Sequence, residues 1–189
     1  RYRQEAEIRY QARHDYLRGL PNRAELIVQM DQAVARAKRY GVRVALVFLD
    51  LDGFKPINDR LGHATGDLVL KTVAERLQVV IRESDTLARQ GGDEFVLLIP
   101  QASDQDGLIT LAHKLQEQVE LPIPDLGGMH LSVSMGIALF PDHAASAEEL
   151  LHLADTAMYE AKQQRQGSGG HVAIATPVPG DPITSQSPA

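Results

Sequence analysis

Residues 89–95 read Arg-Gln-Gly-Gly-Asp-Glu-Phe, two glycines and two carboxylates between short apolar runs. This pattern predicts a β-hairpin with an acidic tip, because glycine tolerates positive φ and lets the phosphates of a ligand approach the backbone. A second acidic element, Asp50-Leu51-Asp52, follows the apolar run 44–49. We therefore expect two strand ends to converge on a hard cation, which prefers oxygen ligands.

The composition indicates one globular domain. The chain has 189 residues, of which 43% are apolar and 23% charged, and its net charge is −6. This length suits a single domain with a sizeable core, and no apolar run reaches the roughly 18 residues that a membrane span needs. The negative charge argues against a nucleic-acid polymer as partner, so a polyphosphate ligand would depend on local cations and metal.

The chain contains no cysteine, which excludes disulfides, thiolate zinc sites and a cysteine nucleophile. Its first residues lack the apolar region of a signal peptide. Both features favour a cytoplasmic setting.

Apolar periodicity divides the chain into elements and flanking segments. In chain order, the expected elements are a helix over 26–37 that ends at Gly41, a strand over 43–50, a polar loop over 52–66, a helix over 70–81, the hairpin, a helix over 108–119, a strand over 129–140, a helix over 150–161 and an edge strand over 171–175. The capping-box signature Ser146-Ala147-Glu148-Glu149 marks the start of the last helix. We expect one domain over 15–175. A helical connector from an upstream region, 1–14, precedes it, and a disordered Pro/Ser-rich linker, 176–189, follows it.

The order of these elements predicts a mixed α/β fold, an α+β sandwich built on a split βαβ unit. We expect the helices to cover one face of the sheet. The strand ends and the hairpin tip then remain open to a ligand.

The acids at the two strand ends are candidate metal ligands. Asp50, Asp93 and Glu94 would surround one or two Mg²⁺ ions, with the Leu51 carbonyl as a further ligand. An isolated Asp-x-Asp is more typical of a solvated surface loop. The neighbouring acidic hairpin is what favours the metal interpretation.

Five stretches of the chain form a larger pattern. They are Asp15-x-Leu17-x-Gly19-Leu20-Pro21-Asn22-Arg23, Asp50-Leu51-Asp52-x-Phe54-Lys55-x-x-Asn58-Asp59-x-x-Gly62-His63-x-x-Gly66-Asp67, Arg89-x-Gly91-Gly92-Asp93-Glu94-Phe95, Ser132-Val133-Ser134-Met135-Gly136-Ile137-Ala138 and Ala154-Asp155-x-Ala157-Met158-Tyr159-x-Ala161-Lys162. In this order they resemble the motifs of the GGDEF family of diguanylate cyclases, over residues 15–166. Arg18 stands where that family usually has threonine.

The resemblance implies a central sheet of the adenylyl-cyclase and polymerase-palm type, flanked by helices and carrying the GGDEF hairpin. It also implies a reaction in which two GTP molecules condense to cyclic di-GMP and two pyrophosphates. The implied cofactor is Mg²⁺ or Mn²⁺, and the implied active state is a two-fold homodimer, with one GTP in each protomer. Such phosphoryl transfer depends on positioning and charge neutralisation, and the substrate supplies the nucleophile.

The resemblance also implies roles for individual residues. The catalytic residues would be Asp93 and Glu94, the metal ligands Asp50, the Leu51 carbonyl, Asp93 and Glu94, and the substrate-binding residues Lys55, Asn58, Asp67, Gly91, Gly92, Lys162 and Arg165. Among the last group, Asn58 and Asp67 would bind the guanine edge. The family usually places an arginine four residues after the helix lysine, whereas Arg165 follows Lys162 by three. GTP affinity would be weaker if Arg165 does not reach the triphosphate.

Arg82 and Asp85 match the Arg-x-x-Asp inhibitory motif of the same family, which implies that the product cyclic di-GMP binds there. Arginine forks suit both phosphate and the guanine Hoogsteen edge. Without its placement relative to the hairpin, a helix C-terminal arginine with a loop aspartate would be the favoured explanation of the pair. His113 occupies the position where a helper arginine is expected on the third long helix.

Two other functions fit parts of the pattern. One is a catalytically silent module that binds GTP or cyclic di-GMP and regulates an attached phosphodiesterase domain, with a sensor domain upstream. The intact Asp50, Asp93 and Glu94 argue against silence. The other is an intramolecular purine nucleotide cyclase, which the Gly-Gly-Asp-Glu-Phe hairpin and the Arg-x-x-Asp motif oppose.

Overall fold

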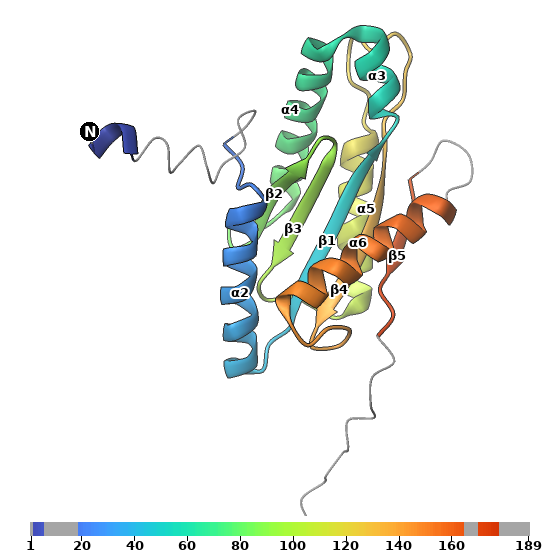
Figure 1. Cartoon of the computed structure of the whole chain (residues 1–189). Coiled ribbons are helices and arrows are strands. Elements are labelled where there is room, and N and C mark those ends of the chain that lie inside the picture. The colour runs from blue at the N-terminus through green and yellow to red at the C-terminus, as the bar shows by residue number, and fades with distance from the viewer. Residues whose placement is uncertain (1, 6–18, 165–169, 178–189) are drawn as a thin grey trace, which may run out of the picture.

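The structure, a computed structural model, describes residues 2–5, 19–164 and 170–177. Its centre is a five-stranded sheet with strand order β2-β3-β1-β4-β5 (Figure 1). The strands are β1 (Val44–Asp52), β2 (Thr86–Gly91), β3 (Glu94–Ile99), β4 (Ser132–Phe140) and β5 (Val172–Ile174), and the longer helices are α2 (Arg23–Tyr40), α3 (Phe54–Leu61), α4 (His63–Val80), α5 (Gln105–Glu120) and α6 (Ala147–Gln164). Neighbouring strands are antiparallel except β4 and β5, which are parallel. The mixed α/β fold with an acidic hairpin is confirmed.

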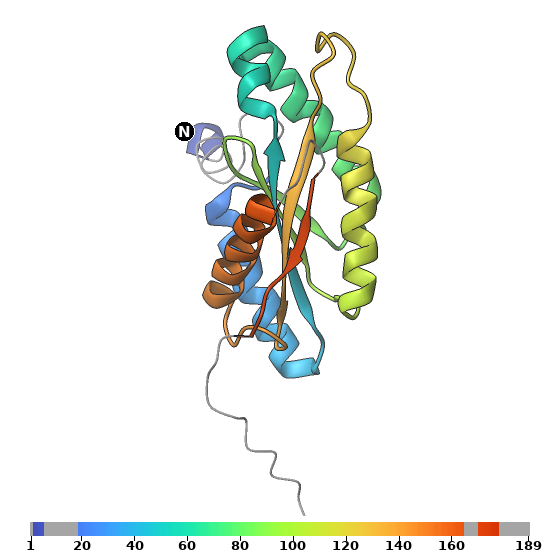
Figure 2. The same ribbon diagram turned by 90° about the vertical axis from the view of Figure 1, so that its right-hand side faces the viewer.

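Helices cover both faces of the sheet, so the expectation of helices on one face was wrong. Seen edge-on, α2 and α6 lie on one side of the strands and α4 and α5 on the other (Figure 2). The reason is that β1 and β4 are buried along their whole length. Strands without a polar face must be covered by other elements on both faces of the sheet.

The two covered faces form two hydrophobic cores, and strand alternation assigns each β1 side chain to one of them. Leu46 and Phe48 pack under α2 and α6, whereas Val47, Leu49 and Leu51 pack under α4 and α5. Successive side chains of a strand point to opposite faces, so the row that begins with Leu46 and Phe48 continues beyond the apolar part of β1. This row decides where the acids of β1 point.

Several element boundaries differ from the sequence expectation. Residues expected as a polar loop form the short helix α3, in which Ile57 is the one residue buried in the core. A single anchoring residue leaves too weak an apolar period to predict a helix. Strand β4 begins at Ser132, not at 129, and β5 takes the expected edge position.

The expected start of α6 is confirmed by its capping contacts. Ser146 Oγ accepts a hydrogen bond from the Glu149 amide, and the Glu149 carboxylate accepts one from the Ala145 amide. Most of the connector 1–14 and of the linker 176–189 lies outside the described residues. Among the described residues, no helix is both long and apolar enough to cross a membrane.

Candidate active site

Strand alternation turns both aspartates of β1 toward α6. Asp50 and Asp52 lie in the same row as Leu46 and Phe48, which pack under that helix. Both aspartates are buried, with only 7% and 4% of their surface exposed. Two adjacent acids of one row are thus withdrawn from water at the end of a strand. Buried carboxylates require cationic or hydrogen-bonding partners.

A glycine in β4 lets α6 come close enough to supply such a partner. Gly136 lies directly beneath the helix, and a Cβ at this position would collide with the Met158 amide nitrogen and the Ala154 carbonyl oxygen. The close approach brings Lys162, in the last turn of α6, over the end of β1. The Ser-x-Gly spacing in β4 therefore serves the site as well as the fold.

Lys162 and Ser134 bind the two buried carboxylates. Lys162 Nζ donates a hydrogen bond to Asp50 Oδ2 at 2.8 Å and lies 4.0 Å from Asp52 Oδ1. Ser134 Oγ donates to Asp52 Oδ2 at 2.6 Å. Asp50 Oδ1 is buried and has no hydrogen-bond partner among the described residues. One acceptor of Asp50 thus lacks a donor or a cation.

The hairpin tip is held against the same strand end. Glu94 pairs with Asp50 in the register of β1 and β3, and the Leu51 amide donates to the Asp93 carbonyl at 3.2 Å. Asp93 therefore lies beside Leu51, as the sequence pattern predicted for two converging acidic elements. Both hairpin acids are partly exposed.

The two glycines and Arg89 shape the turn. Gly91 has φ 151° and Gly92 φ 51°, values in the region that disfavours residues with a Cβ. The Arg89 guanidinium donates twice to the Gly92 carbonyl, at 3.0 and 2.8 Å. In this structure Arg89 therefore fixes the hairpin. A register shift between Arg89 and Gly91 marks the bulge that turns the tip.

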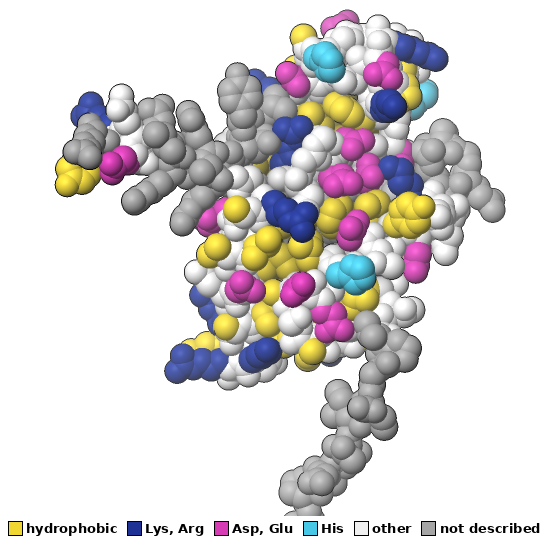
Figure 3. All heavy atoms as spheres, in the orientation of Figure 1, with side chains coloured by type: hydrophobic (Ala, Val, Ile, Leu, Met, Phe, Trp, Pro, Cys, Tyr) yellow, Lys and Arg dark blue, Asp and Glu magenta, His cyan; other side chains and the backbone are white. Residues whose placement is uncertain are grey.

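The acids of the site raise one another's pKa values. Burial raises the pKa of Asp50, and the charge of Asp93 adds to the rise, so the hydrogen bond from Lys162 does not restore the usual value. Burial also raises the pKa of Glu94, with further contributions from Asp50 and Asp155. Burial alone would lower the pKa of Lys162, yet its contact with Asp50 raises it overall. Acidic side chains gather at this face, next to a basic one (Figure 3).

This donor set fits a divalent cation. A buried oxygen without a partner and carboxyl groups with raised pKa values are both relieved by a cation of higher charge than lysine. Asp50, the Leu51 carbonyl and Asp93 are the groups that would hold it, with Glu94 beside them. Within the part of the chain that the structure describes, no three acidic or histidine side chains already converge as a ligand set. Lys162 occupies one oxygen of Asp50.

Helices α3 and α4 bring the candidate guanine-binding residues together. The Asn58 side-chain oxygen packs against Gly66, where a Cβ would collide with it, and the Asn58 amide nitrogen lies 3.1 Å from His63 Nδ1. Asp67 follows Gly66 in α4 and is exposed, as is Lys55 on α3. The Asn58 amide therefore packs against the residue that precedes Asp67.

Arg82 and Asp85 lie away from the hairpin tip. They line a hollow of about 250 Å³ with Lys114 of α5 and Ile99, the last residue of β3. The Arg82 amide donates to Asp85 Oδ2 at 3.0 Å, and the arginine side chain is exposed. The second cation at this hollow is Lys114, whereas the sequence interpretation had considered only His113.

Other candidates are placed differently or were missed. Arg165 lies outside the described residues. Asp155 was missed as a neighbour of Glu94, although it precedes Lys162 by two helical turns and so shares its side of α6. The contact between Ser134 and Asp52 was also missed, because it joins residues 82 positions apart.

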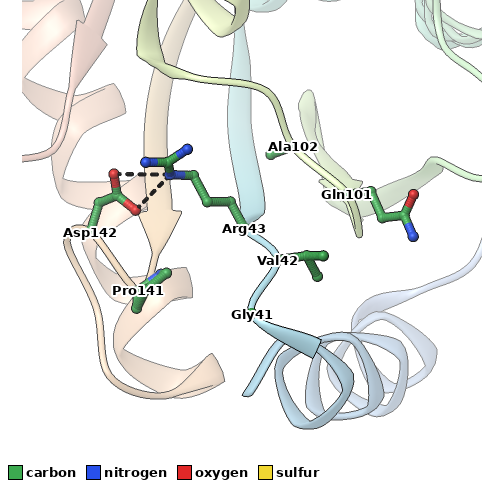
Figure 4. Close-up of a pocket in the computed structure, with 7 residues that line it drawn as sticks. All are labelled: Gly41, Val42, Arg43, Gln101, Ala102, Pro141 and Asp142. Carbon is green, nitrogen blue, oxygen red and sulfur yellow. Dashed lines mark hydrogen bonds and ion pairs between the residues drawn. The ribbon is translucent and has the colours of Figure 1, made fainter. Parts of the chain in front are cut away.

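A second hollow, of about 500 Å³, lies at the opposite end of the sheet. Gly41 to Arg43, Gln101, Ala102, Pro141 and Asp142 line it (Figure 4). Arg43 Nε donates to both carboxylate oxygens of Asp142, at 3.1 and 3.3 Å. Its charged groups are thus already paired, and it holds no cluster of acids.

Comparison with known proteins gives a consistent answer over most of the chain. A sequence model of the family described as "Diguanylate cyclase, GGDEF domain" matches residues 12–168. The chain is 47% identical over 166 residues to the diguanylate cyclase TpbB of Pseudomonas aeruginosa, covering 86% of this chain and 38% of that protein. A solved structure of the TpbB GGDEF domain alone superposes with a TM-score of 0.80 at 40% identity, covering 86% of this chain and 94% of the other.

Two further relatives bear on regulation. The bifunctional diguanylate cyclase/cyclic di-GMP phosphodiesterase MucR of Pseudomonas aeruginosa is 47% identical over 154 residues, covering 81% of this chain and 22% of MucR. A crystal structure of the coiled coil and GGDEF domain of DgcB from Caulobacter crescentus, in complex with c-di-GMP, superposes with a TM-score of 0.79 at 29% identity, covering 92% of this chain and 91% of the other. The chain thus spans well under half of the lengths of TpbB and MucR.

Proposed function

The chain belongs to the GGDEF family of diguanylate cyclase domains, and on that premise we propose that it condenses two GTP molecules into cyclic di-GMP and two pyrophosphates. The observation that carries this proposal is the buried Asp50 beside the acids of the GGDEF hairpin, with one oxygen that no described residue hydrogen-bonds. Such a cluster destabilises the fold until a cation binds it, so it supports a metal-dependent role for this end of the sheet. Natural proteins keep unfavourable groups of this kind mainly at functional sites.

In each half-reaction, the 3′-hydroxyl oxygen of one GTP forms a bond to the α-phosphorus of the other. The bond from that phosphorus to the pyrophosphate oxygen breaks, and the hydroxyl proton leaves. Asp50, the Leu51 carbonyl and Asp93 are the residues that would hold Mg²⁺ or Mn²⁺, which would neutralise the phosphate charge. The raised pKa of Glu94 suits it to accept the hydroxyl proton or to assist at the metal.

The remaining residues bind and orient the substrate. Asn58 and Asp67 would hydrogen-bond the guanine edge, and Lys55 and Lys162 would bind the triphosphate, with Arg165 as a further candidate. Gly91 and Gly92 let the phosphates approach the hairpin backbone. Adenine lacks the donors that Asp67 would accept, so the site should prefer GTP.

The active state we propose is a two-fold homodimer. One protomer binds one GTP at the open end of its sheet, and a symmetric partner turns a second GTP toward it, so each 3′-hydroxyl meets the other α-phosphate. A monomer would be inactive. The cytoplasm is the proposed location of this reaction.

Product inhibition at Arg82 and Asp85 is part of the same proposal. Cyclic di-GMP carries two phosphates and two guanines, and the hollow offers an exposed arginine, a lysine from α5 and an acceptor carboxylate. The DgcB relative was solved with this compound. Lys114 would supply the second cation on the α5 side.

A silent regulatory module is the second candidate, because this chain is also similar to NbdA of Pseudomonas aeruginosa, which is named a cyclic di-GMP phosphodiesterase. Incubation of the purified protein with GTP and Mg²⁺, followed by mass identification of the products, separates the two. Cyclic di-GMP and pyrophosphate are expected, and Asp93→Asn serves as the inactive control. Bound but unchanged GTP would support the silent module instead.

A further inference from the structure

Lys162 lies where a metal would be expected. Its Nζ is 2.8 Å from Asp50 Oδ2 and 4.0 Å from Asp52 Oδ1, so the ammonium group lies against both buried acids. The Lys162 side chain is 40% exposed, whereas the Asp52 side chain is 1% exposed. The lysine therefore has room to move and the second aspartate does not.

The two aspartates of β1 are held in different ways. Asp52 is fixed from β4 by Ser134, whose hydroxyl is fully buried and donates at 2.6 Å. Asp50 has no such anchor; the lysine binds one of its oxygens and the other has no partner among the described residues. Asp50 can accept a new cation on that oxygen, whereas Asp52 Oδ1 already faces the lysine at 4.0 Å. An acid locked by a hydroxyl under a helix keeps its position.

We propose that Lys162 is an internal cation that stands in for the divalent metal on Asp50, and that Asp52, fixed by Ser134, retains the lysine when the metal displaces it. This inference rests on the proposed function, because it takes Asp50 as a metal ligand. The exchange leaves one cation on each aspartate. Asp52 is thus a positioning residue for Lys162.

The exchange follows from charge. A metal on Asp50 repels an ammonium group that shares the same carboxylate, so Lys162 must leave that oxygen. Asp52 prevents its loss to solvent, because a buried carboxylate keeps a strong demand for a positive partner. Lys162 is then released beside the metal, where it can bind a phosphate oxygen of the substrate. In the free protein the same lysine lessens the repulsion among the acids of the site.

The first test is a metal titration without nucleotide. The Mg²⁺ concentration that gives half of the thermal stabilisation is measured for the wild type and for Lys162→Met, with Mn²⁺ binding followed by electron paramagnetic resonance as a second readout. Removing the competing cation should lower the midpoint at least about fivefold, the effect of one unit charge near 4 Å even in water. Lys71→Met, which removes an exposed charge from α4, should leave the midpoint unchanged. An unchanged or higher midpoint in Lys162→Met would overturn the inference.

The second test asks whether Asp52 acts through the lysine. Asp52→Asn should raise the Mg²⁺ midpoint, because Lys162 then loses one of the two buried carboxylates that it contacts and stays on Asp50. In a Lys162→Met background the same substitution should have much less effect. Such non-additivity marks two residues that act on each other. Equal effects in both backgrounds would reduce Asp52 to a general contributor of charge and overturn its positioning role.

Ser134→Ala tests whether Asp52 must be held in position, because this substitution leaves the charge of the site unchanged. Ser134→Ala should raise the KM for GTP more than it lowers kcat, since Lys162 is then held less well beside the phosphates. If Ser134 were purely structural, Ser134→Ala would lower the melting temperature and leave KM unchanged, which would contradict the proposal.

Failure of the proposed function gives a different result from failure of the cation exchange. If the wild type binds Mg²⁺ but forms no cyclic di-GMP, the metal titrations still decide the exchange, whereas a wild type that does not respond to metal overturns both.

Discussion

Charged side chains are paired at one end of strand β1 and incompletely paired at the other. At its start, Arg43 forms an ion pair with Asp142 in which both carboxylate oxygens accept a hydrogen bond. At its end, the buried Asp50 shares one lysine with Asp52, and its other oxygen has no hydrogen-bond partner in the part of the chain that the structure describes. One end satisfies its charges and the other stores electrostatic strain. The difference indicates that the hairpin end is built for a ligand and that the opposite end maintains the fold.

The largest expected effect is at the hairpin tip. Glu94→Gln or Asp93→Asn should lower cyclic di-GMP formation by about 10³-fold or more, because each removes a charge directed at the metal and the reacting groups. Initial rates with GTP and Mg²⁺ measure the loss. Wild-type turnover in either variant, with circular dichroism unchanged, would contradict the metal-centred mechanism.

The same substitution separates catalysis from stability. The pKa of Glu94 is raised by burial and by neighbouring acids, so in the folded state its ionised form is disfavoured. An acid whose folded pKa lies above its unfolded value destabilises the protein at pH values above that unfolded value, near 4.5. At pH 7, Glu94→Gln should therefore keep or raise the melting temperature. A marked decrease would show that the glutamate supports the fold and would weaken the contrast between the two ends.

The next effect concerns the choice of base. Asp67→Ala should reduce kcat/KM for GTP and narrow the advantage of GTP over ATP, because on the proposed function the exposed carboxylate would accept hydrogen bonds from guanine donors that adenine lacks. A site that hydrogen-bonds its substrate can discriminate by roughly 10⁴-fold. Measuring kcat/KM for both nucleotides tests this. Asp59→Ala, which removes an exposed carboxylate from the neighbouring helix α3, is the control and should leave the ratio unchanged.

At the opposite end of β3, Arg82→Ala should change regulation without changing chemistry. The residue lies by the last residue of β3, away from the tip, so the initial rate without product should be retained. Loss of one charged hydrogen-bonding group costs about 1.5–3 kcal/mol, so inhibition by cyclic di-GMP should weaken by at least about tenfold. Lys114→Met should weaken it in the same direction. Equal sensitivity in wild type and Arg82→Ala would make Arg82 a structural residue.

The sequence was a good guide to local features. The hairpin, the end of β1 and the cap of α6 each depend on residues within a few positions of one another, and turn chemistry and periodicity encode such contacts directly. Asp93 and Leu51 could also be brought together in prediction, because two acidic strand ends need a shared cation. The structure places them in contact through a backbone hydrogen bond.

Contacts distant in sequence were beyond such prediction. Lys162 and Asp50 are 112 residues apart, and their contact depends on how closely α6 approaches β4 at Gly136. No local pattern encodes that distance. The two-sided cover of the sheet, by contrast, could have been predicted, because the run over 44–49 is apolar at every position. The expectation of a single covered face did not take this continuous apolar run into account.

The smallest expected effect tests the opposite end as a purely structural region. His143 follows β4, and its Nδ1 accepts a hydrogen bond from the Leu139 amide at 3.0 Å. Burial lowers the pKa of His143, although the charge of Asp142 opposes the shift. A histidine with a lowered folded pKa contributes stability that is complete above its unfolded value of 6.5 and is lost as the pH falls through the folded pKa.

The free energy of unfolding should therefore decrease on going from pH 7.5 to pH 5.5, by about 1 kcal/mol or less for a half-buried hydrogen bond. Denaturant titrations at several pH values measure the slope of the unfolding free energy against pH. His143→Asn keeps a neutral acceptor and should flatten it, whereas His152→Asn, on the exposed side of α6, should not. If the unfolding free energy of His143→Asn depends on pH as steeply as that of the wild type, His143 is not the group that causes the decrease. If the slope flattens while kcat is unchanged at pH 7.5, the two ends are energetically separate. The repulsion among the acids then serves the reaction, and the paired charges at the opposite end stabilise the fold.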